Sequence, residues 1–288
     1  MQDRRAEVAA QVGAHLARVL DGVGDGPVAA AMRYATDGGK RIRALLVMEG
    51  AALHGVPADR ALWPAAAIEA MHAYSLVHDD LPCMDDDSLR RGKPTVHVKW
   101  DEATAVLTGD ALQSLAFELA AHPEGAETAQ ARAALALGLA RAAGAKGMVL
   151  GQARDIAAES AGAPLTLQEI EQLQAGKTGA LIEWAATAGP VMAGGDPAPL
   201  AAYARALGLA FQIADDILDV EGDTATTGKA VGKDAAANKA TFVSLLGLDG
   251  ARARADGLVE DACDALSVYG EGADTLRQTA RFVISRET

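Results

Sequence analysis

Residues 78–87, HDDLPCMDDD, place five aspartates within nine positions, and the sequence on either side is rich in Ala and Leu. Like charges about 4 Å apart repel by roughly 4 kcal/mol at an effective dielectric of about 20. Folding alone does not favour such a cluster, so any fold that contains it needs something to offset the repulsion. A second acidic group, DDILD at 215–219, also follows an apolar stretch.

The composition predicts an all-α fold. Half of the 288 residues are hydrophobic but only 4% are aromatic, and Ala and Leu favour helices whereas strands favour β-branched and aromatic residues. Short breaks separate the expected helices, and none is long enough to mark a domain boundary. We therefore predict a single helical domain over 1–288, with its breaks at 22–27, 54–60, 122–127, 160–166 and 193–199.

The net charge of −13 and the pI near 4.9 argue against binding to nucleic acid or to an anionic membrane surface. The two cysteines, Cys83 and Cys263, form no metal-binding or disulfide pattern. The first ten residues have mixed charge and do not resemble a secretory signal. Because Arg141 and Lys146 interrupt the longest apolar run, we expect no membrane anchor and a cytoplasmic location.

The segment 221–240 differs from the rest, with three glycines, three lysines and little apolar content. A plain surface loop and an active-site lid are both consistent with this composition.

The second acidic motif predicts a metal site. Asp215 and Asp219 are four residues apart and share a helix face, with Asp216 beside them and apolar residues around them. A solvated acidic face would alternate with other polar residues. Mg²⁺ is bound by oxygen ligands, often one or two carboxylates with phosphate oxygens and water.

The first motif can bring its carboxylates together to bind a metal only if its helix is interrupted. Asp79 and Asp85 are six residues apart, about 240° around an ideal helix, but Pro82 lies between them and disrupts the helical hydrogen bonds. We expect the break to bring Asp85 back beside Asp79. An acidic turn at a helix end is the alternative for one motif alone. Two such motifs favour carboxylate clusters that hold several Mg²⁺ ions and a phosphate ligand.

Basic residues recur near these motifs. GGKRIR at 38–43 places Lys40 and Arg43 at a helix start, where cations oppose the macrodipole unless an anion binds there. Arg90 and Arg91 suit bidentate phosphate binding, or they only neutralise the preceding aspartates. GKTGALI at 176–182 is not a P-loop. His78 is interpreted as structural, because Mg²⁺ disfavours imidazole.

Together these motifs resemble the trans-isoprenyl diphosphate synthase family, with the bacterial farnesyl diphosphate synthases as the nearest members. The resemblance covers nearly the whole chain and also includes GDALQSLAFE, GQARDI, FQIADDILDV and GDTATTGKAVGKD. It implies an antiparallel helix bundle around a deep central cavity, usually in a homodimer. It also implies head-to-tail condensation of isopentenyl diphosphate with dimethylallyl and geranyl diphosphate, with three Mg²⁺ ions in each active site and pyrophosphate as the proton acceptor.

The resemblance assigns roles to individual residues. The residues implied to bind Mg²⁺ are Asp79, Asp85 and Asp215, supported by Asp80, Asp216 and Asp219. Those for the allylic diphosphate are Arg90, Lys177 and Lys229, and those for isopentenyl diphosphate are Lys40, Arg43, His72 and Arg91. Thr178 and Gln212 would face the reacting carbons, Lys239 would lie near the closing loop, and Tyr74 with Ser75 would stop chain growth at fifteen carbons.

Two departures from the family pattern bear on these roles. Ala44 replaces a common Pro, with little expected effect on the helix start, and Cys83 is shared with several geranylgeranyl-forming relatives. A geranylgeranyl diphosphate synthase therefore stays an alternative. A class I terpene cyclase would lack GGKRIR and the DDILD motif, and a non-catalytic regulatory subunit would usually lack one acidic motif, whereas both motifs are present here.

Overall fold

The computed structural model describes residues 1–159, 164–221 and 241–285. Helices form almost all of the regular structure in these ranges, so the all-α prediction is confirmed. Chain contacts divide the protein into two compact units, residues 1–137 with 188–195 and residues 138–187 with 196–288. Each unit is described by itself, and the prediction of a single domain around a central cavity stays a prediction.

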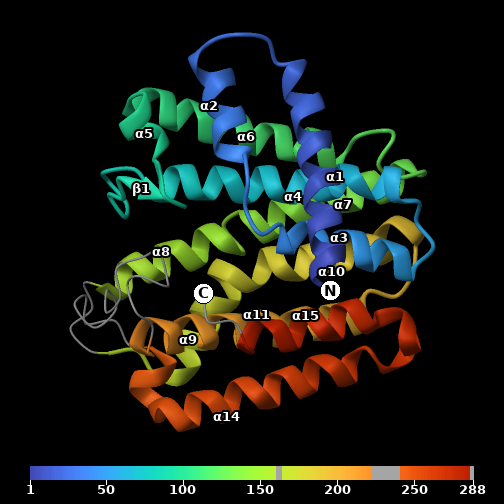
Figure 1. Cartoon of the computed structure of the whole chain (residues 1–288), viewed down its shortest axis with the longest axis vertical. Helices are drawn as coiled ribbons and strands as arrows, with labels where there is room; N and C mark the ends of the chain where they lie inside the picture. Colours follow the sequence, from blue (N-terminus) through green and yellow to red (C-terminus); the bar gives the residue numbers. More distant parts are fainter. Residues whose placement is uncertain (160–163, 222–240, 286–288) are drawn as a thin grey trace. The chain divides into compact units, whose positions relative to one another are not determined.

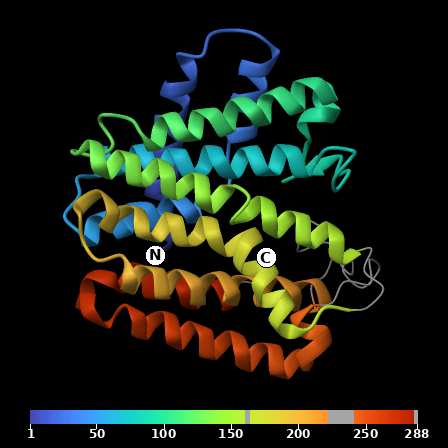
Figure 2. The ribbon, with the colours of Figure 1, turned by 180° about the vertical axis from the view of Figure 1, so that it is seen from behind.

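The first unit is built on long helices and one short hairpin, and α4 and α6 lie side by side in it (Figures 1 and 2). Buried Leu, Ile, Met and Ala side chains of α3, α4 and α6 supply much of its core. Its elements are α1 (Gln2–Asp21), α2 (Pro27–Thr36), α3 (Ile42–Leu53), α4 (Ala58–Asp79), β1 (Leu89–Arg90), β2 (Lys93–Pro94), α5 (Val96–Lys99) and α6 (Glu102–Ala120).

The second unit contains α11 and α14, which lie side by side (Figure 1). The fully buried Tyr203 of α11 donates its hydroxyl to the carbonyl of Leu276 on α15 at 2.9 Å. The remaining elements are α8 (Met148–Glu159), α9 (Leu167–Gln174), a π-helix η1 (Ala175–Gly179), α11 (Ala198–Glu221), α14 (Phe242–Ala265), a 3₁₀-helix η2 (Ser267–Ala273) and α15 (Asp274–Ser285). Both α7 (Ala129–Ala143) and α10 (Ala180–Ala193) are divided between the units.

Local sequence explains where several helices begin. Pro27 occupies the first turn of α2, where its missing N–H costs nothing. Asp101 caps α6 by accepting the N–H of Thr104 at 2.6 Å. Thr166 and Glu169 form a reciprocal capping box at the start of α9.

One part of the described chain, Ala129–Ala158, is long and apolar enough by length and composition to cross a membrane. Its most apolar window has a mean hydropathy of 1.4, and 28% of that window is buried. The expectation that Arg141 and Lys146 exclude such a stretch is therefore wrong by this measure. A single helix of this kind is weak evidence for a membrane span, because core helices of soluble proteins share the same composition.

Candidate active site

A strained turn precedes α3 in the first unit. It lies beside a group of residues, Arg43, His72 and Arg91, that is called the cationic cluster below. Gly38 and Gly39 have φ values of 76° and 92°, and Arg41, the N-cap of α3, has φ 51°. A left-handed conformation costs a non-glycine residue about 1–2 kcal/mol, so the surrounding structure must hold Arg41 in place. The turn presents Lys40 to solvent and places Arg43 in the first turn of α3.

A hairpin brings a second arginine to this turn. Strands β1 and β2 pair antiparallel, and the two residues between them, Arg91 and Gly92, have φ values of 53° and 72°, as two-residue hairpin turns require. A Cβ added at Gly39 would lie 2.7 Å from Nη1 of Arg91. Gly39 therefore gives the Arg91 guanidinium room against the backbone. Arg43 and Arg91, both predicted to bind the same diphosphate, lie in one cluster with this turn.

His72 of α4 faces the same cluster. Burial, followed by the positive charges of Arg43 and Arg91, lowers the pKa of His72 well below 6.5. Burial also lowers the pKa of Arg43, whose Nε has no hydrogen-bond partner among the described residues. Concentrated positive charge with an unsatisfied buried donor is the environment that an anion would relieve.

The first acidic motif bends as its proline predicts. Helix α4 ends at Asp79, and the backbone N–H of Asp85 donates to the carbonyl of Asp79 at 2.9 Å. The predicted break that returns Asp85 to Asp79 is confirmed. It lies at the end of the helix, three residues before Pro82.

Asp80 points its carboxylate at a different partner. It is 3% exposed, and its Oδ1 accepts hydrogen bonds from Nε and Nη2 of Arg90 at 2.7 and 2.5 Å. Burial raises the pKa of Asp80, while the hydrogen bond from Arg90 lowers it in part. Asp80 thus orients Arg90 beside the motif.

The predicted chain-length residues lie one turn before this motif. The ring of Tyr74 packs edge-on against His78 with centroids 5.1 Å apart, and Gln113 of α6 lies near its hydroxyl. His78 contacts the carbonyl of Val106 through Nε2 at 3.0 Å, so its structural interpretation is confirmed. The Oγ of Ser75 donates to the carbonyl of His72 at 2.9 Å.

Sequence reasoning gave no role to the motif GDALQSLAFE, which the structure explains. A Cβ on Gly109 would lie 2.0 Å from Nε2 of His78, so this glycine makes room for the imidazole. Gln113, four residues later on the same helix face, reaches Tyr74. The signal available in the sequence was this spacing of Gly109 and Gln113.

The second acidic motif lies near the end of α11, in the second unit. Asp215 and Asp219 are partly exposed, whereas Asp216 is 7% exposed. The Oδ2 of Asp216 accepts the backbone N–H of Phe242 at 2.8 Å, which satisfies the first turn of α14. The motif therefore has one buried carboxylate that accepts a backbone N–H and two carboxylates on partly exposed residues.

The motif GKTG forms the π-helix η1, and sequence reasoning did not predict this distortion. Nζ of Lys177 lies 2.5 Å from Oδ2 of Asp155, the aspartate of GQARDI, whose role was also missed. The Oγ1 of Thr178 donates to Oε1 of Gln212 at 3.4 Å, and Nε2 of Gln212 donates to Asp216 at 3.5 Å. Thr178 and Gln212 thus belong to one polar network with Asp216, and Lys177 pairs separately with Asp155. Lys229 and Lys239 lie outside the described residues.

The donor set in each unit fits Mg²⁺. Within the described ranges, no group of three or more His, Cys, Asp or Glu side chains is arranged to enclose a metal ion by itself. Each motif instead offers a pair of aspartates that are partly or fully exposed, Asp79 with Asp85 and Asp215 with Asp219. Mg²⁺ is typically bound by one or two carboxylates, with water and substrate phosphate completing its octahedron.

Comparison with known proteins agrees with this chemistry. The polyprenyl synthetase family model matches residues 26–265. The chain is 45% identical over 268 residues to a farnesyl diphosphate synthase from Haemophilus influenzae, covering 91% of this chain and 90% of that protein. It is 46% identical over 269 residues to the corresponding Escherichia coli protein, covering 90% and 89%. The crystal structure of an FPP/GFPP synthase from Zymomonas mobilis superposes with a TM-score of 0.90 at 45% identity, covering 98% of each chain.

Proposed function

Because the chain belongs to the polyprenyl synthetase family, we propose that it is a Mg²⁺-dependent prenyltransferase that makes farnesyl diphosphate. It would join isopentenyl diphosphate head-to-tail to dimethylallyl and then geranyl diphosphate. The observation that carries this proposal is that two features occur in the same unit. One is the cluster of Arg43, His72 and Arg91, and the other is the end of α4, where the N–H of Asp85 donates to the carbonyl of Asp79. Such a unit can bind both a bare diphosphate and a metal-bound one.

Isopentenyl diphosphate would bind at the turn before α3. Lys40, Arg43 and Arg91 would neutralise its diphosphate, and Gly39 allows the ligand and Arg91 to approach the backbone closely. Because its pKa is lowered, His72 would be neutral near pH 7 and would donate one hydrogen bond without adding charge. A diphosphate bound there would favour protonation of His72 by Coulomb attraction.

The allylic diphosphate would bind at the acidic motifs. Asp79, Asp85 and Asp215 would hold three Mg²⁺ ions, and Asp80, Asp216 and Asp219 would support them directly or through their neighbours. When bound, these ions neutralise the charge that develops on a departing pyrophosphate. The cationic groups proposed to assist are Arg90, Lys177 and Lys229.

The condensation of the two diphosphates would proceed in three steps. The allylic C1–O bond breaks and its electron pair leaves with the pyrophosphate, which the surrounding cations stabilise. The double bond of isopentenyl diphosphate attacks C1 and forms a C–C bond. The resulting cation loses a proton to the pyrophosphate, so no protein base is assigned. Thr178 and Gln212 would face the reacting carbons, and the role implied for Lys239 falls outside the described residues.

Tyr74 and Ser75 would limit the product to fifteen carbons. Tyr74 is buried, and its edge-on contact with His78 and the nearby Gln113 side chain restrict where the ring can lie. A ring fixed one turn before Asp79 would block an isoprenoid tail that grows along α4. A twenty-carbon product, as in geranylgeranyl diphosphate synthases, is the alternative that product analysis distinguishes.

We also propose a cytoplasmic homodimer. Large apolar side chains are exposed in the first unit, with Leu107 54% and Leu137 52% exposed. Burial of such a surface against a second copy would remove it from water. This also gives the apolar stretch Ala129–Ala158 a role other than membrane insertion. Sedimentation analysis of the purified protein distinguishes a dimer from a monomer.

The direct test incubates the protein with Mg²⁺, dimethylallyl diphosphate and isopentenyl diphosphate and measures product chain length. We expect farnesyl diphosphate, and we expect no product when EDTA replaces Mg²⁺. Absence of any prenyl product in the presence of Mg²⁺ would refute the proposed activity. A mainly twenty-carbon product would keep the prenyltransferase and replace the farnesyl assignment.

A further inference from the structure

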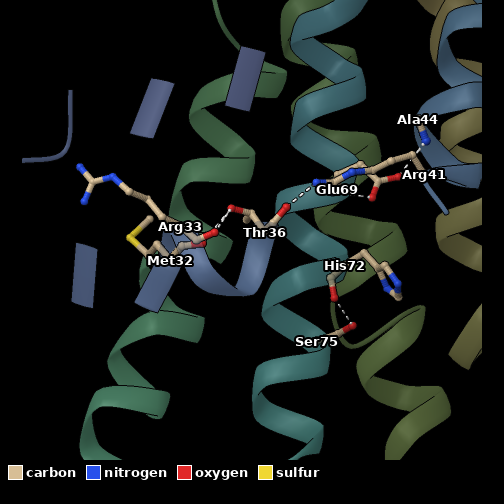
Figure 3. A network of polar contacts seen from close by, with 8 residues as sticks. All are labelled: Met32, Arg33, Thr36, Arg41, Ala44, Glu69, His72 and Ser75. Atoms are coloured by element: carbon tan, nitrogen blue, oxygen red, sulfur yellow. Dashed lines mark hydrogen bonds and ion pairs between the residues drawn. The ribbon is translucent and has the colours of Figure 1, made fainter. Parts of the chain in front are cut away.

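A buried ion pair lies directly behind the cationic cluster. Nη1 of Arg41 donates to Oε2 of Glu69 at 3.1 Å, and the two side chains are 7% and 6% exposed. Glu69 lies in the middle of α4, twenty-eight residues from Arg41 in sequence. Figure 3 shows this pair at the centre of a polar network that joins three helices. None of the predicted functional roles includes either residue.

Arg41 also holds the end of α2. Its Nη2 donates to the main-chain carbonyl of Thr36, the last residue of that helix. Thr36 is itself fixed, because its Oγ1 donates to the carbonyl of Met32 at 2.8 Å. A cation at this position complements the carboxyl end of the helix dipole. The Arg41 guanidinium therefore bridges α2 and α4 while its backbone forms the cap of α3.

Glu69 completes the start of α3 from a neighbouring helix. Its Oε1 accepts the backbone N–H of Ala44 at 3.0 Å, one of the first-turn donors that a helix leaves unsatisfied. The N-cap residue Arg41 makes no side-chain capping bond of its own. One carboxylate thus binds the left-handed Arg41 with one oxygen and caps its helix with the other.

The groups that this pair holds are the ones proposed to bind isopentenyl diphosphate. Arg43 lies between Arg41 and Ala44 in the first turn of α3, and His72 lies one helical turn after Glu69 on α4. The negative charge of Glu69 acts on both Arg43 and Arg91 and partly offsets their mutual repulsion. The ion pair therefore sets the spacing between the turn and α4.

We propose that Arg41 and Glu69 are positioning residues that fix the isopentenyl diphosphate site without touching the substrate. This inference rests on the proposed function, since it names the ligand of that cluster. Arg41 is 8% exposed, and its guanidinium is already bonded to Glu69 and Thr36. A buried ion pair is weak as a source of stability but can specify one geometry.

The test replaces Glu69 with glutamine. Both Arg41 and the Ala44 N–H are donors, so a glutamine amide offers one acceptor oxygen and sets its NH₂ against the other donor. A displacement of about 1 Å in a binding group can cost on the order of a hundredfold. We expect the KM for isopentenyl diphosphate to rise by about tenfold to a hundredfold, with the KM for geranyl diphosphate unchanged.

Three further variants make the result specific. Glu69→Asp keeps both acceptor oxygens and should recover part of the lost affinity for isopentenyl diphosphate. Arg41→Lys keeps the positive charge but loses the planar guanidinium with its paired N–H donors, so it should raise the KM for isopentenyl diphosphate. Glu49→Gln is the matched control. Glu49 is 9% exposed, lies on the same helix α3 and pairs with Arg4 at 2.8 Å, away from the helix start. Its loss should leave both KM values unchanged.

Binding is measured separately by titrating isopentenyl diphosphate calorimetrically into the wild type and each variant, after thermal melts confirm that each is folded. Weaker binding by the Glu69→Gln and Arg41→Lys proteins supports the inference. Equal rises in both KM values, or a lower kcat with unchanged KM values, would overturn it. If the wild type binds isopentenyl diphosphate but makes no product, the proposed function fails, while the binding comparison still decides the positioning role.

Discussion

At the scale of single residues, the buried aspartate of each acidic motif bonds to the protein itself. Asp80 is paired with Arg90, and Asp216 accepts the first-turn N–H of α14. A buried carboxylate without such partners would be costly. Asp79 and Asp215, the first residue of each motif, are less buried than the aspartate that follows. Each Asp-Asp pair therefore combines a more exposed aspartate with a buried one that bonds to the protein.

This division predicts different outcomes for neighbouring aspartates. Asp215→Ala should lower kcat by at least about a hundredfold, because a metal supplies several kcal/mol of charge stabilisation and each tenfold corresponds to about 1.4 kcal/mol. Its melting temperature should stay near that of the wild type. Asp216→Ala leaves the buried N–H of Phe242 unsatisfied and should lower the free energy of unfolding by about 1–3 kcal/mol.

Steady-state kinetics and urea unfolding on the same preparations test both statements. Undiminished turnover in Asp215→Ala would rule out a metal role for that residue. An Asp216→Ala protein as stable as the wild type would show that the bond to Phe242 contributes nothing measurable.

Tyr74 tests whether one side chain limits product length. Tyr74→Ala should shift the product from fifteen to twenty or more carbons, because it opens the space beside His78 and Gln113. Tyr74→Phe keeps the ring and removes only the hydroxyl, so its product should stay at fifteen carbons. Chromatography of the dephosphorylated products measures this shift. An active alanine variant with the wild-type product would exclude Tyr74 as the floor.

At the scale of elements, the π-helix η1 depends on a glycine of another helix. A Cβ on Gly151 would lie 2.1 Å from the backbone nitrogen of Lys177, too close to be relieved by a side-chain rotation. The close approach of α8 to η1 places Asp155, four residues after Gly151, against the ammonium of Lys177. π-helical turns are rare and occur frequently at functional sites.

Gly151→Ala should therefore displace η1 and lower both stability and kcat. We expect a loss of about 1–3 kcal/mol in the free energy of unfolding, the usual cost of overpacking. Gly257→Ala is the control in the same unit. It lies in α14 with nothing near the added Cβ, so the variant should gain up to about 1 kcal/mol from helix propensity. Equal stability changes in the two variants would contradict the role of close approach.

Some elements were predictable from local chemistry and others were not. A break between Asp79 and Asp85 was predicted because Pro82 lies between them and disrupts helical hydrogen bonds. The hairpin at 89–94 was missed because its sequence, LRRGKP, was interpreted by charge alone, although Gly92 is a turn signal. The π-helix has no comparable signature, because it depends on the contact between Gly151 and Lys177 across the fold.

At the scale of the whole molecule, composition was enough to predict the all-α class, since helix formers outnumber strand formers throughout. Composition does not predict which distant residues pair with each other. Nothing local marks Glu69 as the partner of Arg41 and Ala44, because many helices carry a glutamate and only the packing of α3 on α4 selects this one. Candidate site residues were predictable where motifs resemble a family, whereas the residues that support them were not.

The pH dependence of stability is also a property of the whole chain. Burial lowers the pKa of His15, which packs edge-on against Trp63 at 4.6 Å, and burial also lowers the pKa of His72. Well above a pH of about 6.5 both residues are neutral in the folded and unfolded states. As the pH falls below that value, the unfolded chain takes up protons that the folded chain does not. The free energy of unfolding must therefore decrease with falling pH.

The steepest loss should lie between the unfolded pKa of about 6.5 and the lower folded values, at up to about 1.4 kcal/mol per pH unit for each histidine. Urea unfolding followed by circular dichroism between pH 7.5 and 5.5 avoids most carboxylate titration. His15→Leu removes one titrating group, so its stability should depend less steeply on pH than that of the wild type. If the two proteins have the same slope, proton uptake by His15 in the unfolded state does not contribute. If wild-type stability rises as the pH falls, the folded protein binds protons more tightly than the unfolded chain, contrary to the burial of both imidazoles.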